Sequence, residues 1–343
     1  MGTRKHDKEA VLVSGASGFL GGHVVKQLLE KEFFVIATVR SEQAGKVLKS
    51  ELANIDDFTY ELVQLSDKLS FDKVFIKHPN ISKIIHTAAP FDFRVPNLRK
   101  DVIEATVEGT RNLLASTLEN APNVTHIVNT SNLISHFTLD QYSNTALILN
   151  EKCWCNYSFE EGIQNPFKAS HYSKANAEKV FWEFISSHKD RFTGSSVSPG
   201  FMFGPQPFDQ YVLKSSLNTS SELINEVLNL GPEDLDHLPN LFGYLTDVRD
   251  VARLQISTFT NESTHNKRLV PVSGQFSMHG ILNFAKDRFP KISKQLPPRA
   301  RVEIKLFQID DSATREVLDF PLTLGEVTIY DSIKQILQVK NRL

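Results

Sequence analysis

Short runs of apolar residues recur along the N-terminal part of the chain, and residues typical of turns follow each run. The runs are rich in β-branched and aromatic residues, a composition that favours buried strands. The stretches between them, such as 23–31 and 102–118, have the spacing of amphipathic helices; in the second, Ile103, Val107 and Leu114 share one face. The runs predict strands at residues 10–13, 33–39, 84–87, 126–129 and 195–198.

Strands alternating with helices at this spacing predict an α/β fold, a doubly wound parallel sheet of the Rossmann type. After Pro199 the pattern changes, because Pro and Gly interrupt the chain before a helix at 250–259, a strand at 268–272 and a helical C-terminus. We therefore expect a dinucleotide-binding domain and a smaller substrate-side lobe. The expected domain spans 8–200, with 244–273 returning to it, and the expected lobe consists of 201–243 and 274–343.

Composition excludes several functional classes. The 343 residues include 38 Lys and Arg against 40 Asp and Glu, so the formal net charge of −2 provides no overall field that would attract nucleic acid or a membrane surface. No apolar stretch is long enough for a signal peptide or a membrane span. The only cysteines, Cys153 and Cys155, lack the second pair that a zinc site needs, and we expect them to be reduced. We therefore expect a cytoplasmic protein that binds a small molecule and no metal.

A glycine pattern follows the first predicted strand and precedes a predicted helix: Gly15, Gly18 and Gly21 in VLVSGASGFLGGH. Glycine at these positions permits a tight turn in which the backbone approaches a pyrophosphate, whose charge then lies at the helix N-terminus. The flanking strand and helix make a dinucleotide site a stronger interpretation than a plain strand-to-helix turn.

The second predicted strand ends at Arg40 instead of at the Asp or Glu that would bind a ribose 2′-hydroxyl. An arginine at this position can pair with a 2′-phosphate, which favours NADP(H) over NAD(H). The alternative interpretation is an exposed arginine at the end of a strand, with no ligand. NADP(H) is the cofactor that we expect.

Further motifs extend nearly from one end of the chain to the other: TVRS, HTAAPF, VNTSN, AEKVFWEF, SPGFMFGPQPF and DVRDVA. Together with the glycine turn, they resemble the extended short-chain dehydrogenase/reductases, and among them the yeast NADPH-dependent methylglyoxal/isovaleraldehyde (aldehyde and ketone) reductases and the dihydroflavonol-reductase-like proteins. The resemblance implies an NADP(H) site and a small carbonyl substrate, and it assigns no protein partner. The implied cofactor contacts are Gly15, Ser17, Gly18, Phe19, Leu20, Gly21, Arg40, Thr87, Ala88, Pro90, Lys174 and Pro199. Candidates for the apolar substrate wall are Phe91, Phe93, Leu133 and Phe203, and the alternative interpretation is that these residues belong to the core.

The resemblance also implies a catalytic Ser, Tyr and Lys. The Tyr delivers a proton to the carbonyl, and the Lys lies four residues later on the same helix face. Lys174 matches the Lys because the motif AEKVFWEF aligns the helix, and the Tyr position is then Ser170. The family's strand-end TSS reads Thr130, Ser131 and Asn132 here, so Asn132 replaces the catalytic Ser. An Asn amide can still donate a hydrogen bond to a carbonyl oxygen.

Two neighbours of Ser170 are candidates for a replacement proton donor. Tyr172 lies roughly 200° around a helix from Lys174 and would point away from the cofactor. His171 is three residues before Lys174, on a neighbouring part of the same face, and an unperturbed His titrates near neutral pH. The alternative interpretation of His171 is a partly exposed polar residue with no role in catalysis.

The sequence therefore predicts an NADP(H)-binding relative of the carbonyl reductases in which hydride transfer to small aldehydes or ketones is weak or lost. Two alternatives stay open: a non-catalytic NADP(H)-binding regulatory or scaffold protein, and an active reductase with a rearranged proton donor. All three share one fold, so the fold does not choose among them.

Overall fold

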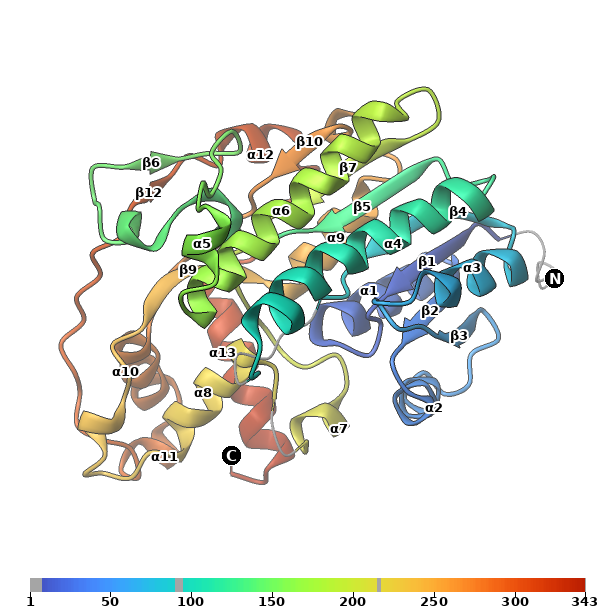
Figure 1. Cartoon of the computed structure of the whole chain (residues 1–343). Helices are drawn as coiled ribbons and strands as arrows, with labels where there is room; N and C mark the ends of the chain where they lie inside the picture. The colour runs from blue at the N-terminus through green and yellow to red at the C-terminus, as the bar shows by residue number, and fades with distance from the viewer. Residues whose placement is uncertain (1–7, 90–94, 215–216, 343) are drawn as a thin grey trace.

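The computed structural model describes residues 8–89, 95–214 and 217–342. Within these residues, seven parallel strands form a central sheet in the order β10-β7-β5-β4-β1-β2-β3 (Figure 1). This order confirms the predicted doubly wound parallel sheet. The strands are β1 (Ala10–Ser14), β2 (Phe34–Val39), β3 (Phe58–Leu62), β4 (Ile81–His86), β5 (His126–Thr130), β7 (Thr193–Val197) and β10 (Lys267–Leu269).

Strand β1 is apolar on both faces, which explains why the sequence shows a continuous apolar run there in place of an alternating pattern. In β1, Val11 and Val13 contribute to the core cluster on one face of the sheet. Ala10 and Leu12 contribute to the cluster on the opposite face. Because helices bury both clusters, the sheet lies in the middle of the domain.

Helices cover both faces of the sheet (Figure 1). On one face α4 packs against α3 and α6, and on the other α1 packs against α9. The predicted helix at 102–118 begins as a π-helical segment, Leu98–Glu104, which continues into α4. The helices are α1 (Phe19–Glu30), α2 (Glu42–Glu51), α3 (Lys68–Lys77), α4 (Ala105–Asn120), α6 (Pro166–Ser187) and α9 (Val248–Ser257).

The smaller lobe surrounds a second sheet, which has three strands in the described residues, in the order β11-β9-β8. These are β8 (Phe201–Phe203), β9 (Phe242–Asp247) and β11 (Gly274–Ser277). The helices of the lobe include α7 (Asp209–Val212), α8 (Thr219–Asn229), α10 (Met278–Arg288), α11 (Pro290–Ser293) and α13 (Gly325–Val339). Shorter elements are the parallel pair β6 (Ile148–Leu149) and β12 (Gln308–Ile309), with α5 (Phe159–Gly162) and α12 (Ser312–Val317).

The segment 244–273, which we expect to return to the Rossmann domain, contributes to both sheets. In this segment α9 and β10 do return to the large sheet, but β9 pairs with β8 and β11 of the small sheet. The physical reason is that Leu245 of β9 packs with Phe203 and Phe276 in the core of the lobe. The composition of an apolar strand does not reveal which of two cores it covers.

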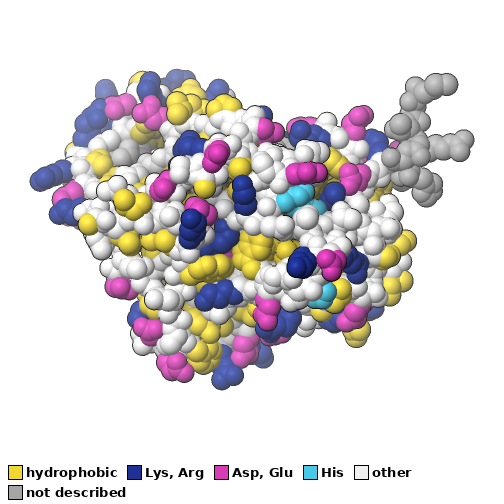
Figure 2. All heavy atoms as spheres, turned by 90° about the horizontal axis from the view of Figure 1, so that it is seen from above, with side chains coloured by type: hydrophobic (Ala, Val, Ile, Leu, Met, Phe, Trp, Pro, Cys, Tyr) yellow, Lys and Arg dark blue, Asp and Glu magenta, His cyan; other side chains and the backbone are white. Residues whose placement is uncertain are grey.

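The surface agrees with the nearly neutral composition. On the face that Figure 2 shows, Lys and Arg side chains are interspersed with Asp and Glu side chains. Opposite charges placed this closely cancel each other's field within a short distance in salt solution. No helix among the described residues is long and apolar enough to cross a membrane.

A buried ion pair joins the last strand of the large sheet to the helix that carries Lys174. Arg268 of β10 donates from Nε to Glu178 Oε1 at 2.8 Å and from Nη2 to Oε2 at 2.9 Å. Ser131 and Ser135 donate to the same carboxylate, which is fully buried on α6. Burial raises the pKa of Glu178, but the hydrogen bonds and charge of Arg268 outweigh burial and hold this pKa at about 2. The pair therefore fixes α6 against the sheet.

Replacing Arg268 by Met should destabilise the fold by about 3–5 kcal/mol, because Glu178 would remain buried without its counter-charge. Adding Glu178→Gln to Arg268→Met should recover part of this loss, since the double variant buries no unpaired charge. Urea denaturation at neutral pH measures the free energies of unfolding of both variants. If the Arg268→Met variant unfolds like the natural chain, the pair does not hold α6 in place.

Candidate functional site

The site begins with the turn between β1 and α1. Gly15 has a φ of +69°, a left-handed conformation that favours glycine, and a Cβ on it would lie 2.9 Å from Ala88 Cα. A Cβ on Gly21 would lie 2.3 Å from the carbonyl oxygen of Gly15. Both positions therefore require glycine, and the turn lies against the chain that follows β4.

The first backbone N–H groups of α1 have no hydrogen-bond acceptor among the residues that the structure describes. The helix begins at Phe19, and no side chain caps it at Gly18. Because the first N–H groups of a helix have no partner within it, those of Phe19, Leu20 and Gly21 can bind an anion. Ser17 is partly buried and Gly18 is exposed, so the turn is open to solvent. These residues fit the pyrophosphate of a dinucleotide cofactor.

Arg40 directly follows β2, and its side chain is exposed. Gln64 Nε2 donates to the carbonyl oxygen of Arg40 at 3.0 Å, and Ser41 caps α2, so the backbone on both sides is held. In the described part of the chain, no carboxylate forms an ion pair with the guanidinium of Arg40. This guanidinium is therefore available for the 2′-phosphate of NADP(H).

Ser14, the last residue of β1, orders the chain after β4. Its Oγ accepts hydrogen bonds from the backbone N–H groups of Thr87 and Ala88, at 3.1 and 3.2 Å. The Thr87 hydroxyl donates to the Ser14 carbonyl oxygen at 2.6 Å. Thr87 and Ala88 therefore lie next to the glycine turn. Three other expected residues of this segment lie outside the described residues: Pro90, Phe91 and Phe93.

Lys174 of α6 lines a cavity of about 10 Å³, roughly the room that one water molecule needs. Ala88, Thr130 and Ser131 line the same cavity, which places it at the carboxyl edge of the sheet. Burial lowers the pKa of Lys174 to about 8, against the Glu178 carboxylate, which raises it. The ammonium forms no hydrogen bond or ion pair with the described residues, so it is available to a ligand.

Ser170 lies one helical turn before Lys174 on α6 and is 8% exposed. Residues four apart share a helix face, so Ser170 holds the position at which the resemblance implies a Tyr. The side chain of Ser170 is shorter than that of Tyr by the whole ring and lacks a phenol. The site therefore contains the Lys of the expected pair without the expected proton donor.

His171 is buried, in contrast to the alternative interpretation of a partly exposed residue. Its Nδ1 lies 2.8 Å from the Phe167 carbonyl oxygen, so Nδ1 carries the proton of the neutral ring and donates it. Its Nε2 is buried without a partner among the described residues. Burial lowers the pKa of His171 to about 4, so the ring is neutral at neutral pH and its only proton is engaged. This geometry disfavours His171 as a proton donor.

Tyr172 lies on the other side of α6. Its ring packs edge-on against Phe159 of α5, with ring centroids 6.0 Å apart, in an apolar cluster with Val102 and Ile103. Tyr172 is not among the residues that line the cavity at Lys174. Proton delivery from Tyr172 would therefore require α6 to unwind locally.

Asn132 and Ser131 use their side chains differently. Ser131 Oγ donates to the Glu178 carboxylate at 2.7 Å. Asn132 Oδ1 accepts from the Ile134 backbone N–H at 3.0 Å and caps the short helix Leu133–His136. Because the oxygen is engaged, the Nδ2 group remains as a hydrogen-bond donor. Asn132 thus has a capping role that sequence reasoning missed, beside its expected role toward a carbonyl oxygen.

Pro199 lies close to Asn132, since the Leu133 N–H donates to the Pro199 carbonyl oxygen at 2.9 Å. Leu133 and Phe203 are buried, each within a core cluster. Neither of them lines the cavity at Lys174. The structure therefore favours a core role for Leu133 and Phe203 over the substrate wall that the resemblance implies.

Sequence reasoning also missed the partners that hold α6. Glu178 lies four residues after Lys174, a spacing that predicts a shared helix face and is a usable signal. Arg268 is 90 positions from Glu178, and no local pattern links the two. The cysteines are free, and among the described residues no group of three or more His, Cys, Asp or Glu side chains could hold a metal ion.

Comparison with known proteins identifies the family. The model of the NAD dependent epimerase/dehydratase family matches residues 11–220, a segment that includes the glycine turn and α6. The chain belongs to this family. The match confirms the family that the motifs indicate.

Two relatives align along almost the whole chain. The putative NADPH-dependent methylglyoxal reductase GRP2 of Candida albicans is 36% identical, over 95% of this chain and 98% of the relative. The NADPH-dependent methylglyoxal reductase GRE2 of Saccharomyces cerevisiae is 33% identical, over 97% of this chain and 100% of the relative. Both names state the NADPH dependence that we expect from Arg40.

Solved structures of related proteins have the same fold as this chain. The yeast methylglyoxal/isovaleraldehyde reductase Gre2, complexed with NADPH, has a TM-score of 0.93 at 33% identity, covering 97% of this chain and 100% of that chain. UDP-glucose 4-epimerase of Thermotoga maritima has a TM-score of 0.71 at 14% identity, covering 96% of this chain and 99% of that chain, and shares the fold alone. The NADPH of the Gre2 complex is the cofactor predicted from the sequence.

Replacing Asn132 by Ala should lower the free energy of unfolding by about 1 kcal/mol, because the helix Leu133–His136 would lose its cap. Asn132→Ser is the matched control, since Ser caps about as well as Asn, and it should unfold like the natural chain. Chemical denaturation compares the three proteins. Equal stability of the Ala and Ser variants would contradict the capping role.

Proposed function

We propose that this protein binds NADP(H) and is a carbonyl reductase relative in which the reduction of small aldehydes or ketones is weak or lost. One observation carries this proposal: α6 presents Lys174 to the cavity beside the glycine turn, with Ser170 one turn before it in the place of a Tyr. The free thiols of Cys153 and Cys155 support a cytoplasmic location.

The cofactor has three points of attachment in this proposal. The free N–H groups at the start of α1 bind the pyrophosphate, Arg40 pairs with the 2′-phosphate, and Lys174 Nζ binds the nicotinamide ribose. The NADPH dependence in the names of GRP2 and GRE2 supports this assignment. When bound, NADPH supplies the hydride, and the residues of the chain orient it and shield it from water.

Rate factors decide between an ordinary and a weak reductase. A positioned general acid contributes about 10²–10⁴ in rate. A donor to the carbonyl oxygen contributes about 10²–10³, and the two losses are not additive within one site. Neither Asn132 nor Ser170 lines the cavity at Lys174. Asn132 retains an Nδ2 donor, whereas Ser170 lacks the phenol that the resemblance implies. The loss of the Tyr alone therefore makes this chain a slow reductase.

A residual reaction still needs a proton. Among the residues that line the cavity, Lys174 carries a proton at Nζ with a pKa of about 8, close to neutral pH. His171 does not qualify, because its only proton is donated to Phe167. In this proposal the residual reduction takes its proton from Lys174 Nζ, directly or through one water molecule.

Replacing Arg40 by Gln should weaken NADPH binding about 10- to 100-fold, because a charge-assisted hydrogen bond to the 2′-phosphate contributes roughly 1.5–3 kcal/mol. NADH binding should change little, since NADH lacks this phosphate. Titrations that follow the fluorescence of each reduced cofactor give both affinities. An equal loss for NADPH and NADH, or no loss for either, would contradict the role of Arg40.

The double variant Asn132→Ser/Ser170→Tyr should consume NADPH with short aldehydes at least about 100-fold faster than the natural chain, because it regains a positioned acid. The matched control is Asn132→Ser/Ser170→Phe, which has the same ring without the hydroxyl and should remain slow. NADPH consumption at high protein concentration measures all three chains.

Three outcomes of this experiment are informative. A natural chain as fast as the Tyr variant would mean that another donor exists, and Tyr172→Phe would then test Tyr172. A Tyr variant that binds NADPH without any gain in turnover would favour the non-catalytic alternative. A natural chain that binds no NADPH would refute the proposal altogether.

A further inference from the structure

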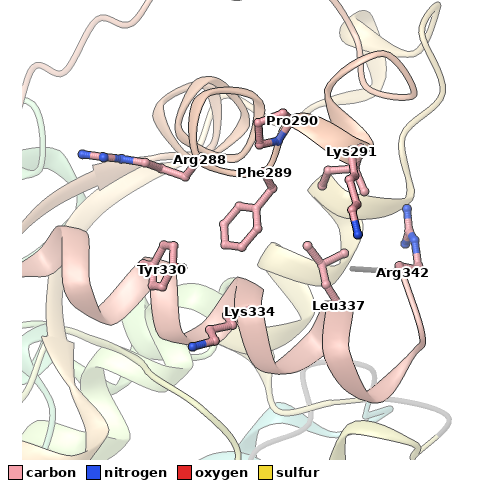
Figure 3. Close-up of a pocket in the computed structure, with 9 residues that line it drawn as sticks. Arg288, Phe289, Pro290, Lys291, Tyr330, Lys334, Leu337 and Arg342 are labelled. Atoms are coloured by element: carbon pink, nitrogen blue, oxygen red, sulfur yellow. The ribbon is translucent and has the colours of Figure 1, made fainter.

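A second pocket, larger than the cavity at Lys174, lies in the smaller lobe. Its volume is about 240 Å³, and it is formed where the end of α10 and α11 meet α13 and the residues that follow it (Figure 3). None of its lining residues belongs to the seven-stranded sheet or to the helices that cover it. The lining residues are Arg288, Phe289, Pro290, Lys291, Ile292, Tyr330, Lys334, Leu337 and Arg342.

One part of this pocket is apolar. The rings of Phe289 and Tyr330 are stacked, with centroids 5.2 Å apart and an angle of 22° between their planes. Phe289, Ile292 and Leu337 are buried in the core of the lobe. Tyr330 is 37% exposed, so its ring borders the opening. The pocket therefore offers a flat apolar wall to a ligand.

The other part is cationic. Of the described residues, four basic ones and no acidic one line the pocket, in a chain whose formal net charge is −2. Within the described residues, Lys291 and Lys334 have no carboxylate partner. The guanidinium of Arg342 donates to two neutral acceptors, the side-chain oxygen of Asn229 and the carbonyl oxygen of Leu228. Arg288 pairs with Glu326, Nη2 to Oε2 at 4.0 Å. The charges of Lys291, Lys334 and Arg342, in contrast, are not neutralised by any carboxylate of the described residues.

A favourable interaction with a helix dipole explains the presence of only one of these basic residues. A cation near a helix C-terminus interacts favourably with the negative end of the helix dipole, which accounts for Arg288 at the end of α10. Lys291 belongs to α11, which has only four residues and a correspondingly small dipole. Lys334 precedes the last turn of α13, and that turn contains no basic residue. An anionic ligand would account for both lysines.

Figure 3 shows how the two parts are arranged. Lys291 and Arg342 extend on the side of the pocket where Leu337 lies, whereas Arg288 extends away from the two rings. We propose that the pocket binds a small organic anion whose carboxylate or phosphate faces Lys291 and Arg342 and whose apolar body covers Leu337 and reaches the rings of Phe289 and Tyr330. The volume is below the roughly 300–1,000 Å³ of pockets for drug-sized ligands, so the anion is small and is not a dinucleotide.

Calorimetric titration of the full chain with benzoate and with phenyl phosphate tests this proposal. Saturating NADPH is present, so that the nucleotide site does not compete for the probes, and a repeat without NADPH keeps the test independent of the proposed function. We expect saturable binding of at least one anion and none of benzamide, the neutral analogue of benzoate. Binding of benzoate alone assigns a carboxylate ligand, and binding of phenyl phosphate alone assigns a phosphate.

Lys291→Glu should weaken the binding of the anion at least about tenfold, because it reverses a charge at the head group. Lys294→Glu is the matched control: Lys294 is an exposed lysine three residues later that does not line the pocket, and its replacement should leave the affinity unchanged. Tyr330→Ser should also weaken binding, because it removes part of the apolar wall. The proposal is overturned if neither anion saturates, if benzamide binds as well, or if Lys291→Glu and Lys294→Glu behave alike.

Discussion

The buried ion pair between Arg268 and Glu178 is the interaction on which the candidate site depends. It lies where α6, β10 and the segment after β5 meet, and Ser131 and Ser135 complete the hydrogen bonding of the carboxylate. A buried ion pair is tolerated inside a protein only when its polar atoms have hydrogen-bond partners. The side chains that surround the pair must therefore be held in fixed positions. Because the pair fixes the rotation of α6, it determines that Lys174 lines the cavity.

The two halves of the site depend on different parts of the chain. In the proposed function, backbone N–H groups and glycine conformations bind the pyrophosphate, so side-chain substitutions elsewhere need not disturb this part of the site. Fast proton delivery by the mechanism that the resemblance implies, in contrast, depends on one phenol at one position. Ser170 fits the buried face of α6 as a small residue, and the fold keeps its form without that phenol. A chain can therefore keep its cofactor site while its rate of carbonyl reduction falls. Cofactor binding and catalytic turnover must then be measured separately.

Local sequence patterns predicted the features that are formed by residues close together in the sequence. The strand, the glycine turn and the following helix are contiguous, and the predicted parallel sheet is confirmed. Helix geometry alone placed Tyr172 on the far side from Lys174, and the structure has it there. Long-range contacts were beyond this reasoning. The pairing of Glu178 with Arg268, the membership of β9 in the small sheet and the packing of His171 against Phe137 all depend on segments distant in sequence.

A single-turnover experiment tests the central claim most directly, because it observes the cofactor site and the proton donor together. The natural chain is saturated with NADPH and mixed with excess methylglyoxal, and the fluorescence of the bound NADPH is followed. The account predicts a clear signal of bound NADPH that decays at least about 100-fold more slowly than in the Asn132→Ser/Ser170→Tyr variant. Absence of the bound signal, or decay as fast as in that variant, would contradict it.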